Sequence, residues 1–238
     1  MPPAAAGSRA GRPLVIAHRG ASGYEYENSP AAFRDAAPRG ADAVELDIHA
    51  TLDGALFVHH DETVGPTHIA RSTAAQVGAL RLPSGEAVPT LDQALDAIDP
   101  SLKVFVEVKS LPPQFDGRLF AAIDRGANKG RCAVHGFDHR IVSRLGLARP
   151  ALPRGVLLAS YPLRPLACLE DTGATVLWED QGLIDAPLVD AVHGANYQLF
   201  AWTVNAVEDM QRLIALEVDG LCTNYPDIAR RAVGGVAA

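Results

Sequence analysis

Two carboxylates alternate with large apolar residues in the segment Val44-Glu45-Leu46-Asp47-Ile48-His49. Successive side chains of a β-strand point to opposite faces, so Glu45 and Asp47 share one face of a predicted strand. Two ionised carboxylates side by side in a protein interior repel each other and lose their hydration. A divalent cation between them is the simplest resolution, and we therefore expect Glu45 and Asp47 to bind a metal ion.

The same alternation recurs in Val104-Phe105-Val106-Glu107-Val108-Lys109 and adds a third carboxylate. With Glu107, the carboxylates provide three oxygen ligands, a set that suits Mg²⁺ or Ca²⁺ and suits zinc poorly. Lys109 is then free to stabilise charge that develops on a phosphate. The alternative is an interior salt bridge between Glu107 and Lys109, with the other two carboxylates simply hydrated.

An imidazole and a guanidinium follow the first predicted strand, in Ala17-His18-Arg19-Gly20. Arginine suits bidentate binding of a phosphate, and histidine transfers protons near neutral pH. Alone, this tripeptide would be read as a loop histidine and a surface arginine. Its place after a strand, together with its downstream partners, favours a functional role for both residues.

A second imidazole comes from Val58-His59-His60-Asp61. An acid–base pair must approach opposite sides of the bond that breaks, which histidines on separate strands can do. We prefer His60 for this role because it immediately precedes Asp61. His59 remains the alternative candidate for this acid–base role.

These polar residues need a scaffold that brings several strand ends together. The chain alternates predicted strands and helices, and counting from Leu14 gives eight main strands. No Gly-rich dinucleotide fingerprint follows the first strand, which favours a TIM (β/α)8 barrel over an open doubly wound sheet. The predicted barrel strands cover residues 14–17, 43–49, 102–108, 132–137, 154–159, 174–178, 197–204 and 218–222. Active sites of such barrels lie at the carboxyl ends of the strands, where the unusual polar residues fall.

A short loop-rich insertion is expected after the second barrel strand. Residues 55–58 form a short strand, and the segment 62–89, which contains Gly, Pro and Thr, has one short helix near 74–80. Thr90 and Gln93 then form a capping box that opens a helix through Ile98. The predicted helices between the barrel strands cover residues 30–37, 91–98, 115–127, 139–148, 163–171, 186–193 and 206–215. Asn205, with Glu208 three residues later, gives a second capping signal.

Length and charge restrict the class of protein. A chain of 238 residues suits one α/β domain, and we divide it into a flexible N-terminal tail, 1–12, and a barrel domain, 13–234. The net charge of −7 argues against a general nucleic-acid binder, which needs a cationic face.

Cysteine usage and hydropathy indicate a cytoplasmic protein. Cys132, Cys168 and Cys222 are odd in number and form no CxxC pattern, so we expect neither a disulfide framework nor a zinc cluster. No segment is long and apolar enough to span a bilayer. We also expect no stable membrane association, because the sequence offers no amphipathic basic helix or exposed aromatic cluster.

Taken in order, these segments resemble the glycerophosphodiester phosphodiesterase family over nearly the whole chain. The similar segments are His18-Arg19-Gly20, Glu27-Asn28-Ser29, Glu45-Leu46-Asp47, His60-Asp61-Glu62-Thr63, Glu107-Val108-Lys109, Trp202-Thr203-Val204-Asn205 and the run from Val218 to Asp227. The resemblance implies a TIM barrel that cleaves glycerophosphodiesters, small molecules, to glycerol 3-phosphate and an alcohol.

The resemblance also implies roles for individual residues. These are His18 and His60 as the acid–base pair, Glu45, Asp47 and Glu107 as ligands of Mg²⁺ or Ca²⁺, and Arg19 and Lys109 as phosphate contacts. Trp202 is expected to line the substrate pocket, although ordinary strand packing explains it equally well. The chain departs from the family pattern at Tyr26-Glu27-Asn28-Ser29, which replaces Pro-Glu-Asn-Thr. It also carries His135-Gly136-Phe137-Asp138 in place of a Ser-Phe-Asp run, a change that could alter the substrate pocket.

Two other functions remain open from the sequence. One is a phospholipase-D-like reaction on a lipid phosphodiester, and the other is a catalytically silent barrel that binds phosphodiesters. The sequence also leaves open whether water or the glycerol 2-hydroxyl attacks first, and whether the chain forms a homo-oligomer.

Overall fold

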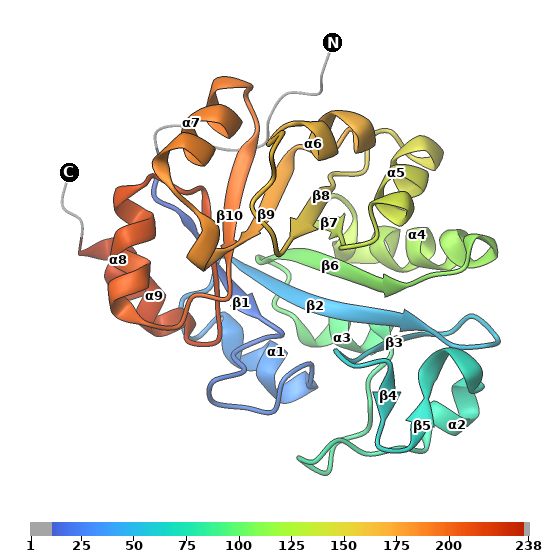
Figure 1. The fold of residues 1–238 in the computed structure, drawn as a ribbon. Coiled ribbons are helices and arrows are strands. Elements are labelled where there is room, and N and C mark those ends of the chain that lie inside the picture. The colour runs from blue at the N-terminus through green and yellow to red at the C-terminus, as the bar shows by residue number, and fades with distance from the viewer. Residues whose placement is uncertain (1–10, 236–238) are drawn as a thin grey trace.

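Eight parallel strands form the barrel in the computed structural model, which describes residues 11–235 (Figure 1). They are β1 (Leu14–His18), β2 (Ala43–Ala50), β6 (Lys103–Ser110), β7 (Cys132–His135), β8 (Gly155–Leu158), β9 (Val176–Asp180), β10 (Gln198–Trp202) and β11 (Gly220–Thr223). The sheet runs β7-β6-β2-β1-β11-β10-β9-β8, and a parallel bridge between Val134 and Arg154 brings its two edges together. The predicted TIM barrel is confirmed.

Helices connect the barrel strands and surround the sheet (Figure 1). They are α1 (Pro30–Ala36), α3 (Leu91–Ala97), α4 (Asp116–Asp124), α5 (His139–Ala148), α6 (Ala167–Thr172), α7 (Ala186–Gly194), α8 (Val207–Ala215) and α9 (Pro226–Gly234). The capping box of Thr90 and Gln93 is present at α3. The predicted cap at Asn205 is wrong, since α8 follows Ala206 without a side-chain cap and Asn205 Oδ1 accepts from the Asn224 backbone N–H at 2.9 Å. Helix α9 was not predicted.

Apolar side chains pack on both surfaces of the sheet. Inside the barrel, the Trp178 ring makes edge contacts with Phe105 and Phe200, at centroid distances of 5.1 and 5.0 Å. Outside, buried residues such as Phe33 and Leu46 fill the space between the sheet and the helices. Each such side chain contributes about 1.5–3 kcal/mol through burial, which fixes the strand ends that carry the polar residues.

The loop-rich insertion lies between β2 and β6, as predicted. It contains β3 (Leu56–Val58), β4 (Thr63–Val64), β5 (Thr67–His68) and α2 (Ala74–Gly78). Strand β3 pairs antiparallel with the end of β2, and Phe57, Val64 and Ile69 belong to a small core of its own. This hairpin returns the chain to the carboxyl end of β2, where the His59 N–H donates to the Asp47 carbonyl at 3.1 Å.

Other predictions concern the chain as a whole. The predicted tail, residues 1–12, lies outside the described residues except for positions 11 and 12. Cys132, Cys168 and Cys222 are each free. Within residues 11–235, no helix has the length and apolar character needed to cross a bilayer.

Candidate active site

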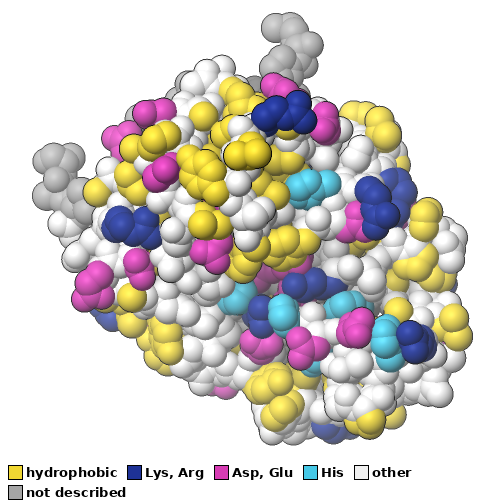
Figure 2. All heavy atoms as spheres, viewed as in Figure 1, with side chains coloured by type: hydrophobic (Ala, Val, Ile, Leu, Met, Phe, Trp, Pro, Cys, Tyr) yellow, Lys and Arg dark blue, Asp and Glu magenta, His cyan; other side chains and the backbone are white. Residues whose placement is uncertain are grey.

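One cavity at the carboxyl ends of the barrel strands gathers the predicted site residues. It is lined by His18, Arg19, Glu45, His60, Glu107, Lys109 and Trp202. Asp47, the remaining predicted residue, contacts both Arg19 and Lys109 beside it. In Figure 2, basic, acidic and histidine side chains gather around a central hollow that hydrophobic side chains border.

Strand register explains why the three carboxylates meet. Asp47 on β2 pairs with Glu107 on β6, and Glu45 pairs with His18 on β1. Donor oxygens of Glu45, Asp47 and Glu107 all lie within 4.8 Å of one another. Glu45 and Asp47 are 3% and 1% exposed, so the alternative in which they are simply hydrated is wrong.

The protein alone does not stabilise all three of these carboxyl groups in their ionised form. Burial, followed by the charge of Asp47, raises the pKa of Glu45 to about 8 and that of Glu107 to about 7. Burial opposes ionisation of Asp47 as well, but Lys109 and Arg19 together lower its pKa. A divalent cation would allow all three groups to ionise, and an all-oxygen set fits a hard ion. The residues therefore fit the metal that the resemblance implies.

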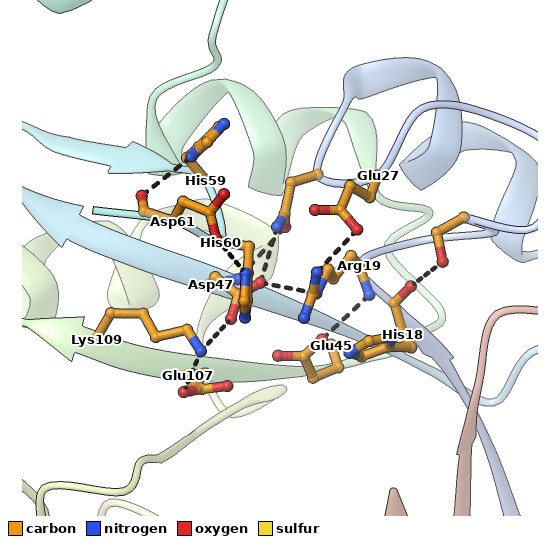
Figure 3. Close-up of polar contacts among 12 residues, drawn as sticks. His18, Arg19, Glu27, Glu45, Asp47, His59, His60, Asp61, Glu107 and Lys109 are labelled. Carbon is orange, nitrogen blue, oxygen red and sulfur yellow. Dashed lines mark hydrogen bonds and ion pairs between the residues drawn. The ribbon is translucent and has the colours of Figure 1, made fainter. Parts of the chain in front are cut away.

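Two cations lie against the carboxylates (Figure 3). Lys109 Nζ is 2.7 Å from Glu107 Oε1 and 3.3 Å from Asp47 Oδ1. Arg19 Nε is 3.2 Å from Asp47 Oδ2, and its Nη1 donates to Glu27 Oε2 at 2.8 Å. The salt bridge between Glu107 and Lys109, which was the alternative to the predicted metal site, is thus present as part of a larger network that includes Asp47.

His18 is held in one tautomer by a residue far along the chain. Its Nδ1 donates to Asn224 Oδ1 at 2.7 Å, which leaves the Nε2 lone pair to accept a proton. Burial, with help from the Arg19 charge, lowers the pKa of His18 to about 4. The ring is therefore neutral at pH 7, as a general base must be.

His60 has a different partner from His18. Its Nδ1 donates to Asp61 Oδ1 at 2.8 Å, and the side chain is 34% exposed. The hydrogen bond from His60 lowers the pKa of Asp61, which keeps that group a carboxylate. His59 lies next to it, but its Nδ1 hydrogen-bonds to the Asp61 backbone carbonyl at 3.0 Å, and His60 is the one that lines the cavity.

Several positioning residues were not assigned a role from the sequence. Asn28 Nδ2 donates to Asp47 Oδ2 at 2.8 Å from a left-handed backbone conformation, with φ of 54°. His49 Nε2 donates to the His60 carbonyl and its Nδ1 accepts from the Ser110 hydroxyl, both at 3.2 Å. Asn28 and Asn224 both lie in segments that resemble the family, and these segments were the sequence signal that could have identified them as site residues. Nothing in the local pattern identified the partners of His49.

Trp202 lies at the end of β10, on the rim of the cavity. Its ring makes an edge contact with Phe137 at a centroid distance of 5.5 Å, and Lys109 Nζ is 5.9 Å from the centre of the Phe137 ring. These two rings border the side of the cavity next to the cations.

The fold and the position of the site define an enzyme of the (β/α)8-barrel class. Residues 18–228 match the model of the glycerophosphoryl diester phosphodiesterase family. A glycerophosphodiester phosphodiesterase of Caldanaerobacter subterraneus is 34% identical over 230 residues, which cover 90% of this chain and 95% of that protein. The chain belongs to the glycerophosphoryl diester phosphodiesterase family, and the resemblance of its motifs is confirmed.

Solved structures share the fold. A glycerophosphodiester phosphodiesterase from Parabacteroides distasonis matches with a TM-score of 0.86 and 24% identity, covering 96% of this chain and 99% of that one. An Oleispira antarctica phosphodiesterase, solved in complex with the product sn-glycerol-3-phosphate, matches with a TM-score of 0.83 and 23% identity, covering 94% and 97%.

Proposed function

We propose that this protein hydrolyses glycerophosphodiesters to sn-glycerol 3-phosphate and an alcohol, in a reaction that depends on a divalent cation. The family and the relative that is 34% identical support the substrate class. The observation that carries the proposal is the convergence of two imidazoles, three buried carboxylates and two cations on one cavity. The free cysteines support action in a reducing compartment, the cytoplasm.

Glu45, Asp47 and Glu107 would hold Mg²⁺ or Ca²⁺. The bound ion would supply positive charge that attracts the negatively charged phosphate. Ionisation of all three carboxylates without the ion would set three negative charges against the two positive charges of Arg19 and Lys109, and the site would then repel an anionic phosphodiester.

The histidines divide the proton transfers. His18, neutral and with Nε2 free, accepts the proton of the attacking hydroxyl, which belongs to water or to the glycerol 2-position. His60 donates a proton to the leaving alkoxide, with Asp61 holding its Nδ1. Arg19 and Lys109 stabilise the charge on the phosphate oxygens.

The test is release of glycerol 3-phosphate from glycerophosphocholine and glycerophosphoethanolamine. We expect activity with Mg²⁺ or Ca²⁺ and loss of activity with a chelator that the added metal reverses. Phosphorus NMR during the reaction detects a cyclic phosphate if the glycerol 2-hydroxyl attacks first. No glycerol 3-phosphate with either metal would reject the proposal.

A second candidate is the phospholipase-D-like reaction on a lipid phosphodiester. It is favoured by apolar side chains on the loops after β7 and β8, where Phe137 is 45%, Tyr161 42% and Leu163 100% exposed. Such side chains beside a cavity can contact the acyl chain of a lysophospholipid.

A further inference from the structure

A second cavity lies at the amino ends of the barrel strands, at the opposite end of the barrel from the candidate active site. It has a volume of about 130 Å³ and is lined by the first residues of six barrel strands, Leu14, Lys103, Cys132, Gly155, Val176 and Gln198. An apolar cavity of about 150 Å³ in another protein binds benzene, so this cavity has room for one six-membered ring. No residue proposed for catalysis or metal binding lines it.

Three aromatic rings form the inner wall of this second cavity. Phe105, Trp178 and Phe200 all line it, and each is at most 7% exposed. The Phe105 and Phe200 rings make an edge contact at a centroid distance of 5.6 Å, and both also contact Trp178. Trp178 lines the active-site cavity as well, so its ring separates the two cavities. A wall of this kind suits the flat face or edge of an aromatic ligand.

The wall also carries one hydrogen-bond donor, the indole N–H of Trp178. Gly155 lies against this edge of the indole, since a Cβ at Gly155 would be 2.7 Å from Trp178 Nε1, and both residues line the cavity. Among the hydrogen bonds of residues 11–235, none involves this N–H. A buried indole N–H normally has an acceptor, so a ligand that carries one gains a hydrogen bond here.

The charged residues around the cavity are all of one sign. Lys103, Arg131 and Arg154 line it, and no Asp or Glu does. The guanidinium groups of Arg131 and Arg154 donate to backbone carbonyls, such as those of Leu102 and Thr172. Within the described part of the chain, none of the three cations forms an ion pair with a carboxylate. In a protein with a net charge of −7, this lining favours an anion locally.

We propose that this cavity is a binding site for a small aromatic carboxylate, a molecule with one ring and one acid group. The ring packs against the aromatic wall, and the carboxylate accepts the Trp178 N–H and lies in the field of Lys103, Arg131 and Arg154. A neutral ring of the same size would gain the packing but not the charge. The volume of the cavity restricts the ligand to a single ring.

Benzoate is the probe, and benzyl alcohol is the neutral molecule matched to it in size. Calorimetric titration of the wild type should show binding of benzoate at least about tenfold tighter than that of benzyl alcohol. A133L, which fills the cavity from β7, should abolish the binding of benzoate. K103Q should weaken it about threefold or more, whereas K129Q, which removes an exposed lysine outside the lining, should leave it unchanged.

Nuclear magnetic resonance locates the bound benzoate, because the chain has two tryptophans, Trp178 and Trp202. Benzoate should shift the indole ¹H–¹⁵N resonance of Trp178 and leave that of Trp202 in place. A shift of Trp202 alone would put benzoate in the active-site cavity and overturn the proposal.

Other outcomes that overturn the proposal come from the titrations. The wild type alone overturns it if millimolar benzoate does not bind, or if benzoate and benzyl alcohol bind equally well. Unchanged affinity for benzoate in A133L would also overturn it, and A133V replaces A133L if that variant does not fold. Each of these results leaves the proposed phosphodiesterase activity untouched, because the two cavities use different residues for binding.

Discussion

His18 and His60 are predicted to carry the proton transfers because their free ring nitrogens face the cavity. We expect H18Q and H60Q each to lower kcat by about 10²–10⁴-fold, since each change removes one proton-transfer group. The affinity for the metal should remain near that of the wild type. Steady-state release of glycerol 3-phosphate measures kcat, and calorimetry measures metal binding.

The matched control is the neighbouring histidine. H59Q removes a ring that hydrogen-bonds to a backbone carbonyl, so its kcat should stay within a few-fold of the wild type. A loss in H59Q as large as that in H60Q would mean that the two histidines have been assigned the wrong way round.

His49 is predicted to act on the reaction by holding His60. H49F keeps a ring in place but removes both hydrogen bonds, to the His60 carbonyl and the Ser110 hydroxyl. We expect kcat to fall about tenfold with KM nearly unchanged, and H49Q to recover part of kcat because its amide can donate to the same carbonyl. Equal kcat in H49F and H49Q would contradict a positioning role.

The carboxylates are predicted to oppose folding in the absence of metal. E45Q removes a buried group that Asp47 repels, so the metal-free variant should unfold at higher urea than the wild type, by on the order of 1 kcal/mol or more. The same change removes a proposed metal ligand. The rise in melting temperature that Mg²⁺ or Ca²⁺ gives the wild type should therefore shrink in E45Q, and an undiminished rise would exclude Glu45 as a ligand.

Elements were predicted well where their signals are local. The capping residues of α3 and the alternation in β2 depend on neighbours in sequence, and both were found from the sequence. Alternation also placed Glu45 and Asp47 on one face, but the meeting with Glu107 depends on the pairing of β2 with β6.

Long-range partners explain what was missed. Asn205 looks like a helix cap from sequence, but it is used to hold the start of the segment that carries Asn224. Asn224 in turn is 206 positions from His18, and His135 meets Glu45 only across the barrel interior. Such contacts follow from closure of the barrel and from no pattern within one element.

Strand β9 carries a buried carboxyl that the proposed reaction does not use. Glu179 is 0% exposed, its Oε1 accepts from the Asp180 N–H at 3.0 Å, and Oε2 has no hydrogen-bond partner among the described residues. Burial raises the pKa of Glu179 to about 7, and the nearby ionisable groups are Asp180 and Cys168 of α6. The folded state therefore binds this proton more tightly than the unfolded state does.

The contribution of Glu179 to the stability of the folded state depends on pH. It is fully present below the pKa of Glu179 in the unfolded chain, near 4.5, and it is lost as the pH rises through the folded-state pKa of about 7. E179Q lacks this loss, so at pH 8 it should be more stable than the wild type by roughly 2–3 kcal/mol relative to their difference at pH 4. Urea unfolding at the two pH values measures this. E170Q, which changes an exposed carboxylate on α6, is the control, and its stability should depend on pH as that of the wild type does. If the stability of E179Q also shows the same pH dependence as the wild type, the prediction is contradicted.

Across the whole molecule, exposed large apolar side chains are concentrated at one end of the barrel. Those in loops or helix starts that follow barrel strands are Tyr24, Leu52, Phe137, Tyr161, Leu163 and Val207. Leu147, 81% exposed on α5, lies elsewhere. Within residues 11–235, the end that carries the active-site cavity thus also carries most of the exposed large apolar side chains, which is why a lipid substrate stays the second candidate.

The substrate class is decided by changing this rim and leaving the site intact. L163D places a charge at the fully exposed position after β8, at a residue that is not among those proposed to bind phosphate or transfer protons. Hydrolysis of glycerophosphocholine should stay within about twofold of the wild type, because that substrate has no acyl chain to contact Leu163. Any hydrolysis of lysophosphatidylcholine should fall in L163D and remain unchanged in L147D, an exposed leucine away from the rim. Equal rates on the lysolipid for wild type and L163D would exclude an acyl contact at this position, and no reaction with the lysolipid in the wild type would reject the second candidate.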